Sequence, residues 1–245
     1  MVGRDLLSFI CNNRASSRSL HNLRLLNVSN STFMDSNKFC VVVALAKLRN
    51  LQVLNVSNTE FSKNSLELVV EDLPLLDTLD ISQTKVNDIS PLRKCKDRLK
   101  FLSLYGCKLP ASTSEAVVSV LCELQHLVHL DLSDDKEDGQ QFDVMSPGAK
   151  FKISALLQRT ESLPKLHSLD ISGMLTVVES WAGITLTTNS TAGKEEILLG
   201  ELCPFVKSHS RLTYLGLVLT DSCKEEMFTD LAHEDFNQAL GNKCQ

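Results

Sequence analysis

The sequence predicts an α/β solenoid, in which similar units stack so that short parallel strands form one layer and helices form the other. Three observations predict this fold class. The phrase "LPLLDTLDIS" at residues 73–82 returns as "LPKLHSLDIS" at residues 163–172. Its core, Leu-x-x-Leu-x-apolar, occurs seven times along the chain. The 245 residues include 42 leucines but only 5% aromatic residues, as expected for a core of stacked leucine side chains.

The spacing of the phrase identifies the kind of repeat. The second leucines of the seven copies follow one another after 28, 25, 23, 28, 39 and 46 residues. Leucine-rich repeats have about 20–29 residues per unit, so the first four spacings fit and the last two require insertions. We therefore predict one leucine-rich-repeat domain over residues 1–245, with about seven repeats. The seven leucines are Leu26, Leu54, Leu79, Leu102, Leu130, Leu169 and Leu215.

Each phrase reads as a short strand that is buried on one side, because apolar and polar positions alternate. The strands are expected to stack in parallel and line the concave face of a curved solenoid, with helices on the convex side. The polar positions then form columns on the concave face. One column is Leu25, Val53, Thr78, Phe101, His129, Ser168 and Tyr214. The next is Asn27, Asn55, Asp80, Ser103, Asp131, Asp170 and Gly216, and a third begins Ser29, Ser57, Ser82 and Tyr105.

The residues after each strand predict a turn and then a helix. The leucine-rich-repeat pattern has Asn or Cys at the turn, and here the position holds Ser31, Thr59, Thr84 and Cys107. Hydroxyl groups are therefore expected to replace the amide in the first three turns. Helices are predicted at residues 37–48, 88–95, 151–163 and 195–202, the last ended by Pro204. A fifth, at 116–124, follows the possible capping box of residues 112–115.

Two segments interrupt the repeats. Residues 134–150 are acidic and contain two glycines and a proline. Residues 173–194 are rich in Thr, Ser and Gly and contain Trp181, the only tryptophan. Insertions in repeat proteins often bind partners, whereas charged runs usually form solvated loops. Both interpretations stay open for these two segments.

Composition argues against several classes of protein. The net charge of −5 and the pI of about 5.7 give no basis for binding nucleic acid or anionic lipid. The longest apolar run, residues 40–46, is too short to span a bilayer. The eight cysteines include no Cys-x-x-Cys pair, and several occupy apolar repeat positions, which indicates free thiols in a reducing, intracellular compartment. Four Asn-x-Ser/Thr sequons oppose that interpretation, but two of them are explained by the repeat, and residues 1–20 show no secretion-signal pattern.

No catalytic motif is present, so we predict a protein that is not an enzyme and that needs no cofactor or metal. His126 and His129 lie three positions apart on a strand, which places them on opposite faces. Asp80, Asp131 and Asp170 form an acidic column that fits either an acid–base or cation site or a ladder of structural Asx residues; we favour the ladder. The candidate protein-binding residues are Asp80, Phe101, Tyr105, His129, Asp131, Asp170 and Tyr214.

Several stretches resemble the Zyg-eleven/Zer-one family. They are residues 73–104, 123–136, 163–173 and 212–221, and the most specific are "CKDRLKFL" and "HLDLSDDK". Members of this family are substrate receptors of cullin-2 RING ubiquitin ligases, with an elongin-binding box, leucine-rich repeats and an armadillo-like domain that recognises N-terminal glycine degrons. The resemblance covers only the leucine-rich-repeat part. It implies a ligase subunit with cullin-2, elongin and substrate proteins as partners, but no degron-contacting residue carries over.

The first residues allow two interpretations. Leu7, Cys11 and Ala15 have the spacing of an elongin-binding box, Leu-x3-Cys-x3-aliphatic. The family's box lies upstream of the repeats, and Leu6 stands where the box prefers Ser, Thr or Pro. We therefore interpret residues 1–18 as a capping or truncated repeat helix, which covers the apolar end of the stack. On this interpretation the chain is a fragment that lacks the elongin box and the armadillo-like domain. The alternative is a free-standing scaffold that binds an unrelated protein on its concave face.

Overall fold

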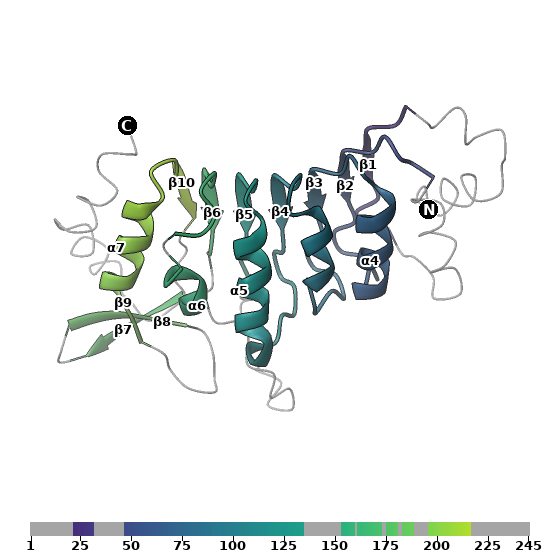
Figure 1. The fold of residues 1–245 in the computed structure, drawn as a ribbon. Coiled ribbons are helices and arrows are strands. Elements are labelled where there is room, and N and C mark those ends of the chain that lie inside the picture. The colour runs from purple at the N-terminus through teal and green to yellow at the C-terminus, as the bar shows by residue number, and fades with distance from the viewer. Residues whose placement is uncertain are drawn as a thin grey trace.

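The computed structural model describes residues 22–31, 47–134, 153–159, 161–172, 175–180, 183–188 and 196–216. Seven three-residue strands form one parallel sheet in the order β1-β2-β3-β4-β5-β6-β10 (Figure 1). The strands are β1 (Leu25–Asn27), β2 (Val53–Asn55), β3 (Thr78–Asp80), β4 (Phe101–Ser103), β5 (His129–Asp131), β6 (Ser168–Asp170) and β10 (Tyr214–Gly216). This arrangement confirms the predicted leucine-rich-repeat solenoid with seven parallel strands.

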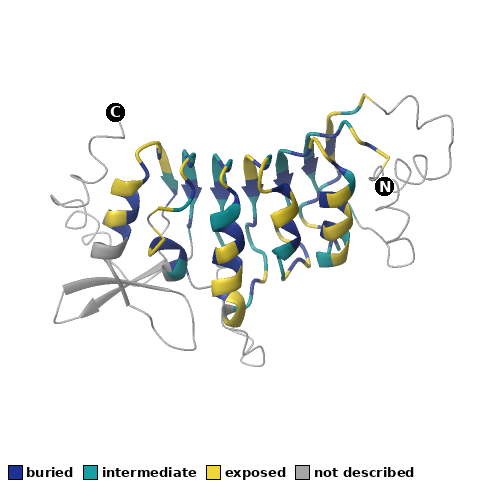
Figure 2. Ribbon diagram, viewed as in Figure 1, coloured by how far each residue is buried: buried dark blue, intermediate teal, exposed yellow. Residues whose placement is uncertain are grey.

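The middle residue of every strand is the predicted leucine. The strand register pairs Leu26 with Leu54 and continues leucine to leucine as far as Leu169 and Leu215. Six of the seven are buried, and Leu215, at the end of the sheet, is partly buried against the same core (Figure 2). The apolar residue two positions further on, such as Ile81 or Ile171, is also buried. Because each unit offers one apolar edge, only stacking removes that edge from water.

Helices cover one face of the sheet, as predicted (Figure 1). They are α4 (Lys63–Asp72), the 3-10 helices η2 (Ser90–Cys95) and η3 (Ala111–Thr113), α5 (Ser114–Glu123), α6 (Ile153–Leu157) and α7 (Leu199–Ser208). Helix α4 was not among the predicted helices, although it buries Leu66, Val69 and Val70. The predicted helix at 37–48 lies outside the described residues except for its last two.

Three predicted helix limits are wrong. Helix α5 is capped by Thr113, which makes no side-chain hydrogen bond, so the proposed capping box does not form. Helix α6 has only five residues of the thirteen predicted at 151–163. Helix α7 starts at Leu199 instead of residue 195, because residues 196–198 pair as a strand, and it continues through Pro204 to Ser208. Pro204 removes only the donor that would reach back one turn.

The second insertion contains a small antiparallel sheet. Its strands are β7 (Leu175–Ser180), β8 (Gly183–Thr188) and β9 (Glu196–Leu198), in that order. β-Branched residues, which favour strands, make up much of β7 and β8. The interpretation of residues 173–194 as a loop is therefore wrong over β7 and β8. Trp181 and nearly all of residues 134–150 lie outside the described part.

The turns after the strands bond as their hydroxyl groups predict. Thr59 Oγ1 donates to the Val56 carbonyl at 2.6 Å, and Thr84 Oγ1 donates to the Ile81 carbonyl at 2.7 Å. Cys107 Sγ lies 3.1 Å from the same Ile81 carbonyl. One position before each turn residue, the backbone is left-handed, with φ of 56° at Asn30, 50° at Asn58, 52° at Gln83 and 62° at Gly106.

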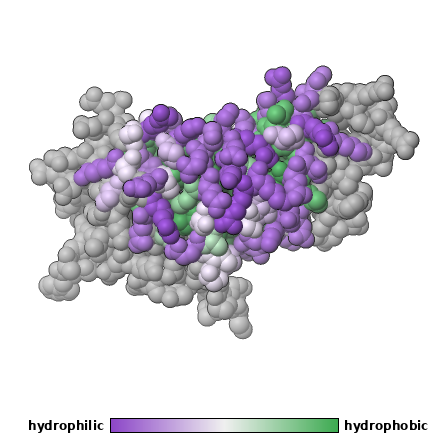
Figure 3. Space-filling model, viewed as in Figure 1, coloured by the Kyte–Doolittle hydropathy of each residue, from purple (hydrophilic) through white to green (hydrophobic). Residues whose placement is uncertain are grey.

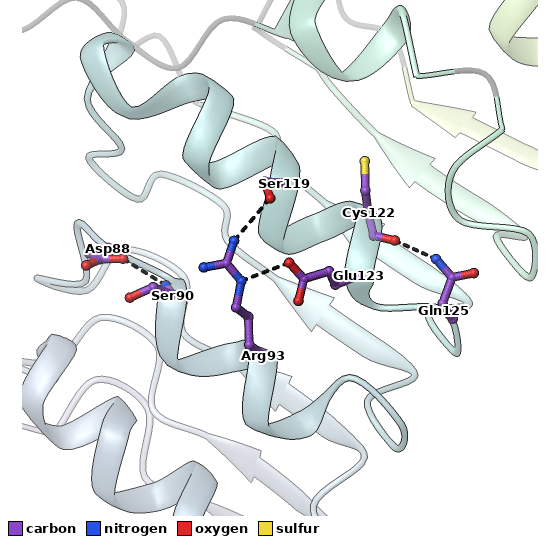
Figure 4. Close-up of polar contacts among 7 residues, drawn as sticks. All are labelled: Asp88, Ser90, Arg93, Ser119, Cys122, Glu123 and Gln125. Carbon is purple, nitrogen blue, oxygen red and sulfur yellow. Dashed lines mark hydrogen bonds and ion pairs between the residues drawn. The ribbon is translucent and has the colours of Figure 1, made fainter.

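Polar contacts between consecutive units tie the helical face together. Arg93 in η2 bonds Glu123 at 2.9 Å and Ser119 at 3.1 Å, both in α5 (Figure 4). Arg159 reaches Glu115 at 3.2 Å in the same way. The surface over the helices is mostly hydrophilic (Figure 3). Exposed ion pairs stabilise a fold little, so these contacts fix the alignment of the units more than they add free energy.

The cysteines and the apolar segments agree with the composition. Cys95, Cys107 and Cys122 are free thiols, and burial raises the pKa of the Cys95 thiol to about 11. Such a thiol is protonated at neutral pH and packs as a small apolar group. Among the described residues, no helix is long and apolar enough to cross a membrane.

Candidate protein-binding face

The sheet face opposite the helices carries the predicted columns, and we call it the open face. The strand register places Phe101 beside His129, with Tyr214 two strands further along the same column. The neighbouring column contains Asp80, Asp131 and Asp170. Tyr105 lies two residues beyond β4 and is half-buried. The fold therefore brings the candidate residues to one face, although Asp80 is separated from Asp131 by the strand that carries Ser103.

The open face exposes large apolar side chains. Phe101 is 42% exposed and Tyr214 is 53% exposed. The Phe101 ring lies 6.0 Å from the His129 ring, centroid to centroid, with the planes tilted by 31°. Leu25, at the other end of the column, is 58% exposed. Leu25 was not selected from the sequence, although its column position was assigned correctly and a leucine at an inner position could have indicated it.

The acidic column is a hydrogen-bonded ladder. Asp80 Oδ1 accepts from the Ser82 backbone N–H at 3.0 Å, and Asp131 and Asp170 accept from the Ser133 and Ser172 N–H groups at 2.9 Å. Each carboxylate thus closes the turn at the end of its own strand. Bonds between strands also occur, from Asn55 Nδ2 to Asp80 Oδ2 at 2.8 Å and from Ser103 Oγ to Asp131 Oδ2 at 2.8 Å. These contacts support the interpretation as structural Asx residues.

The ladder still leaves negative charge on the open face. The strand positions of both columns contain three aspartates and neither lysine nor arginine. The field is felt by Tyr214, because the nearby Asp170 carboxylate, 3.4 Å from the phenol oxygen, raises the pKa of that phenol. The described residues include no group of three His, Cys, Asp or Glu side chains placed to hold a metal ion. A positively charged partner group would therefore gain Coulomb energy at this face.

The two histidines of β5 and the turn before it do not share a site. His129 lies on the open face against Phe101, whereas His126 Nδ1 lies 3.1 Å from Lys165 Nζ in the turn before β6. Their predicted separation is consistent with these contacts.

Gly216 is required by the Asp170 side chain. Its φ is not left-handed, yet a Cβ at Gly216 would overlap the Asp170 carboxylate. We expect Gly216→Ala to lower the free energy of unfolding by about 1–2 kcal/mol, because Asp170 must leave the Ser172 N–H. In an Asp170→Ala background the same change should cost almost nothing. Urea unfolding of the four proteins of this double-mutant cycle measures the difference; additive effects would contradict the proposed overlap.

Comparison with known proteins follows the fold. The stacked parallel strands and the leucine ladder define a leucine-rich-repeat protein. Residues 110–220 match the family model described as "Zer-1-like, Leucine-rich repeats". This part of the chain is therefore a Zer-1-like leucine-rich-repeat region, in agreement with the resemblance found in the sequence.

Two solved structures are similar to the chain at low identity. One is an internalin (inlF) from Listeria monocytogenes, at 16% identity and a TM-score of 0.48, over 90% of this chain and 57% of the internalin. The other is actin-binding site 2 of leiomodin-1, at 15% identity and a TM-score of 0.41, over 54% of this chain and 78% of that one. The chain thus spans little more than half of the internalin's length.

Proposed function

We propose that the chain is the protein-interaction repeat domain of a substrate-recognition subunit of an intracellular cullin-2 RING ubiquitin ligase. The Zer-1-like match over residues 110–220 supports the assignment to this class. In this proposal the domain works by binding proteins, with no catalytic step of its own, and its partners are substrate proteins and, through the whole receptor, cullin-2 and elongin. Nucleic acid and membranes are not partners.

The observation that carries the proposal is the open face. Phe101 and Tyr214 are exposed on strands, which hold side chains more rigidly than loops. Exposed aromatic residues are enriched at the centres of protein interfaces. Beside them stand Asp131 and Asp170, with no basic side chain at the strand positions of either column. A partner segment that carries Lys or Arg would pair its charge with these carboxylates and pack its stem on the aromatic rings.

A second function stays a candidate for the same reason. A free-standing leucine-rich-repeat scaffold that binds an unrelated protein would use the same open face, because the repeat fold hosts many functions. In a larger protein the face could instead contact a neighbouring domain.

The open face is tested by capture from cell lysate with tagged variants of the chain. We expect Phe101→Ala, Tyr105→Ala and Asp131→Lys to fold normally by circular dichroism and to lose proteins that the parent chain captures. Two matched controls lie on the helical side: Leu68→Ala, at a side chain 40% exposed, and Asp97→Lys, at an exposed aspartate. If the three open-face variants capture an unchanged set, this face is not the binding surface, and the insertion around Trp181 becomes the next candidate.

The same capture experiment separates the two functions. A longer protein that contains this domain is expected to co-purify with cullin-2 and elongin, whereas residues 1–245 alone are not. Absence of both from the longer protein favours the free-standing scaffold. Strong elongin binding by residues 1–245 that Leu7→Ala or Cys11→Ala abolishes would instead assign an elongin-binding box to residues 7–15.

A further inference from the structure

A groove of about 610 Å³ runs along the carboxyl ends of the first four strands. It is separate from the open-face columns, and we call it the rim groove. Pockets that bind ligands commonly have about 300–1,000 Å³. Four consecutive strand-to-helix turns supply its lining, which consists of Asn30, Ser31, Asn58, Thr59, Glu60, Gln83, Thr84, Lys85, Asn87, Lys108 and Pro110.

The left-handed turn residues give the rim groove its amide groups. Asn30, Asn58 and Gln83 occupy equivalent positions of three successive repeats, and all three side chains are exposed. Asn58 Nδ2 donates to Asn30 Oδ1 at 2.7 Å, so the first two amides lie side by side. In the fourth repeat the equivalent residue is Gly106, and a Cβ there would lie 2.9 Å from Gln83 Cγ. The Gln83 side chain therefore lies over a position that must lack a side chain.

Hydrogen-bonding capacity in the rim groove is only partly used. The buried Thr59 and Thr84 hydroxyls donate to carbonyls of their own turns. Within the described part of the chain, Asn58 Oδ1 and the Gln83 side-chain amide have no hydrogen-bond partner, and Asn30 Nδ2 has none either. Each side-chain amide combines donors with an acceptor, as a peptide group does. A row of such amides complements the main chain of an extended segment, whatever its sequence.

Charge sets the polarity of the rim groove. Glu60 and Lys85, from adjacent repeats, form an ion pair and neutralise each other. Lys108 is exposed at the end formed by the fourth repeat, and it makes no ion pair with any described residue. The rim groove therefore has one uncompensated positive charge, at the opposite sign to the open face. An acidic side chain of the ligand would be favoured at that end.

We propose that the rim groove binds an extended polypeptide segment of a partner protein, with its main chain on the Asn58 and Gln83 amides and an acidic residue at Lys108. Neighbouring strands of a sheet lie about 4.8 Å apart, so four repeats span roughly 14 Å. An extended chain advances about 3.3 Å per residue, so four or five residues fill this length. The site is independent of the open face and takes a ligand of opposite charge.

The test uses the whole 245-residue chain and a phage-displayed library of random peptides, each longer than the groove. We expect the selected peptides to share at least one acidic residue. Their affinity should fall about tenfold in the double variant Asn58→Gly, Gln83→Gly, which removes two amides. Glycine is the substitute because both positions have positive φ. Lys108→Glu should weaken binding of the acidic peptides by a similar factor.

Two controls make the result decisive. Lys96→Glu reverses an exposed charge outside the groove and should leave peptide affinity unchanged. Phe101→Ala, on the open face, should also leave it unchanged. The proposal is overturned if no peptide is selected, if the selected peptides lack acidic residues, or if their binding survives the groove variants. It is also overturned if their binding is lost in Phe101→Ala. The open-face capture experiment does not depend on any of these outcomes.

Discussion

Replacing Leu102 by alanine is expected to lower the free energy of unfolding by about 2–5 kcal/mol. Leu102 is fully buried in β4, the central strand, and its register partners are Leu79 and Leu130. The truncation leaves a cavity that both neighbouring repeats line. Neither repeat can close it without moving a strand whose backbone is bonded on both sides.

A matched leucine on the same sheet provides the control. Leu25 lies in β1 with 58% of its surface exposed, so Leu25→Ala should change stability by no more than about 0.5 kcal/mol. Urea unfolding followed by circular dichroism measures both variants. Equal effects at Leu102 and Leu25 would contradict the assignment of the two sheet faces.

Truncating His209 is expected to cost about 2–4 kcal/mol, from lost packing and from carbonyl groups left without partners. His209 is a buried side chain that follows α7, and its ring stacks on Phe205 at 3.9 Å between centroids. Its Nε2 lies 2.6 Å from the Ser162 carbonyl in the turn before β6, and its Nδ1 lies 2.7 Å from the Phe205 carbonyl. This imidazole thus joins the last repeat to the one before it.

Two further variants separate packing from hydrogen bonding. His209→Phe keeps an aromatic ring on Phe205 but removes both contacts to the carbonyls, so it should lose part of the stability that His209→Ala loses. Ser208→Ala, at the adjacent exposed residue, should be close to neutral. Thermal and urea unfolding give the order of the four proteins. If His209→Phe matches the parent chain, the two ring nitrogens contribute nothing to stability.

The strand layer could be predicted because its pattern is set by burial alone. A position such as Leu79 must be leucine-like in every repeat, since its side chain packs on the same position of the two neighbours. The period therefore gave the strands, their parallel order, their register and the two faces. The hydroxyl groups of Thr59 and Thr84 followed from the same alignment, because their chemistry replaces that of an amide at one fixed position.

The helical layer was harder to predict because its units vary. The segment after β5 contains only the five-residue α6, and an insertion separates it from its strand. At residues 196–198, pairing with β8 outweighs the helical tendency of the sequence that follows. Helix α4 was missed because "KNSLELVVED" mixes buried and charged residues, and only packing against the next repeat decides its face.

The candidate site was partly predictable. The open-face residues followed from alternation along each strand, but the bonds between columns, such as Ser103 to Asp131, depend on side-chain torsions that no pattern specifies. The rim groove was not predicted. Its signal was the amide residue directly after the third column, in "SN" at 29–30, "SN" at 57–58 and "SQ" at 82–83.

Strand β4 belongs to both proposed surfaces. Phe101 begins the strand on the open face, and Lys108 follows it at the end of the rim groove. In a linear stack, a disturbance passes from one repeat only to its neighbours. Occupancy of one surface can therefore alter the affinity of the other chiefly through this shared repeat, and by linkage any such cooperativity would be reciprocal. A protein built this way could hold a basic segment and an acidic segment of two different chains at once, as a bivalent adaptor whose two affinities meet at a single strand.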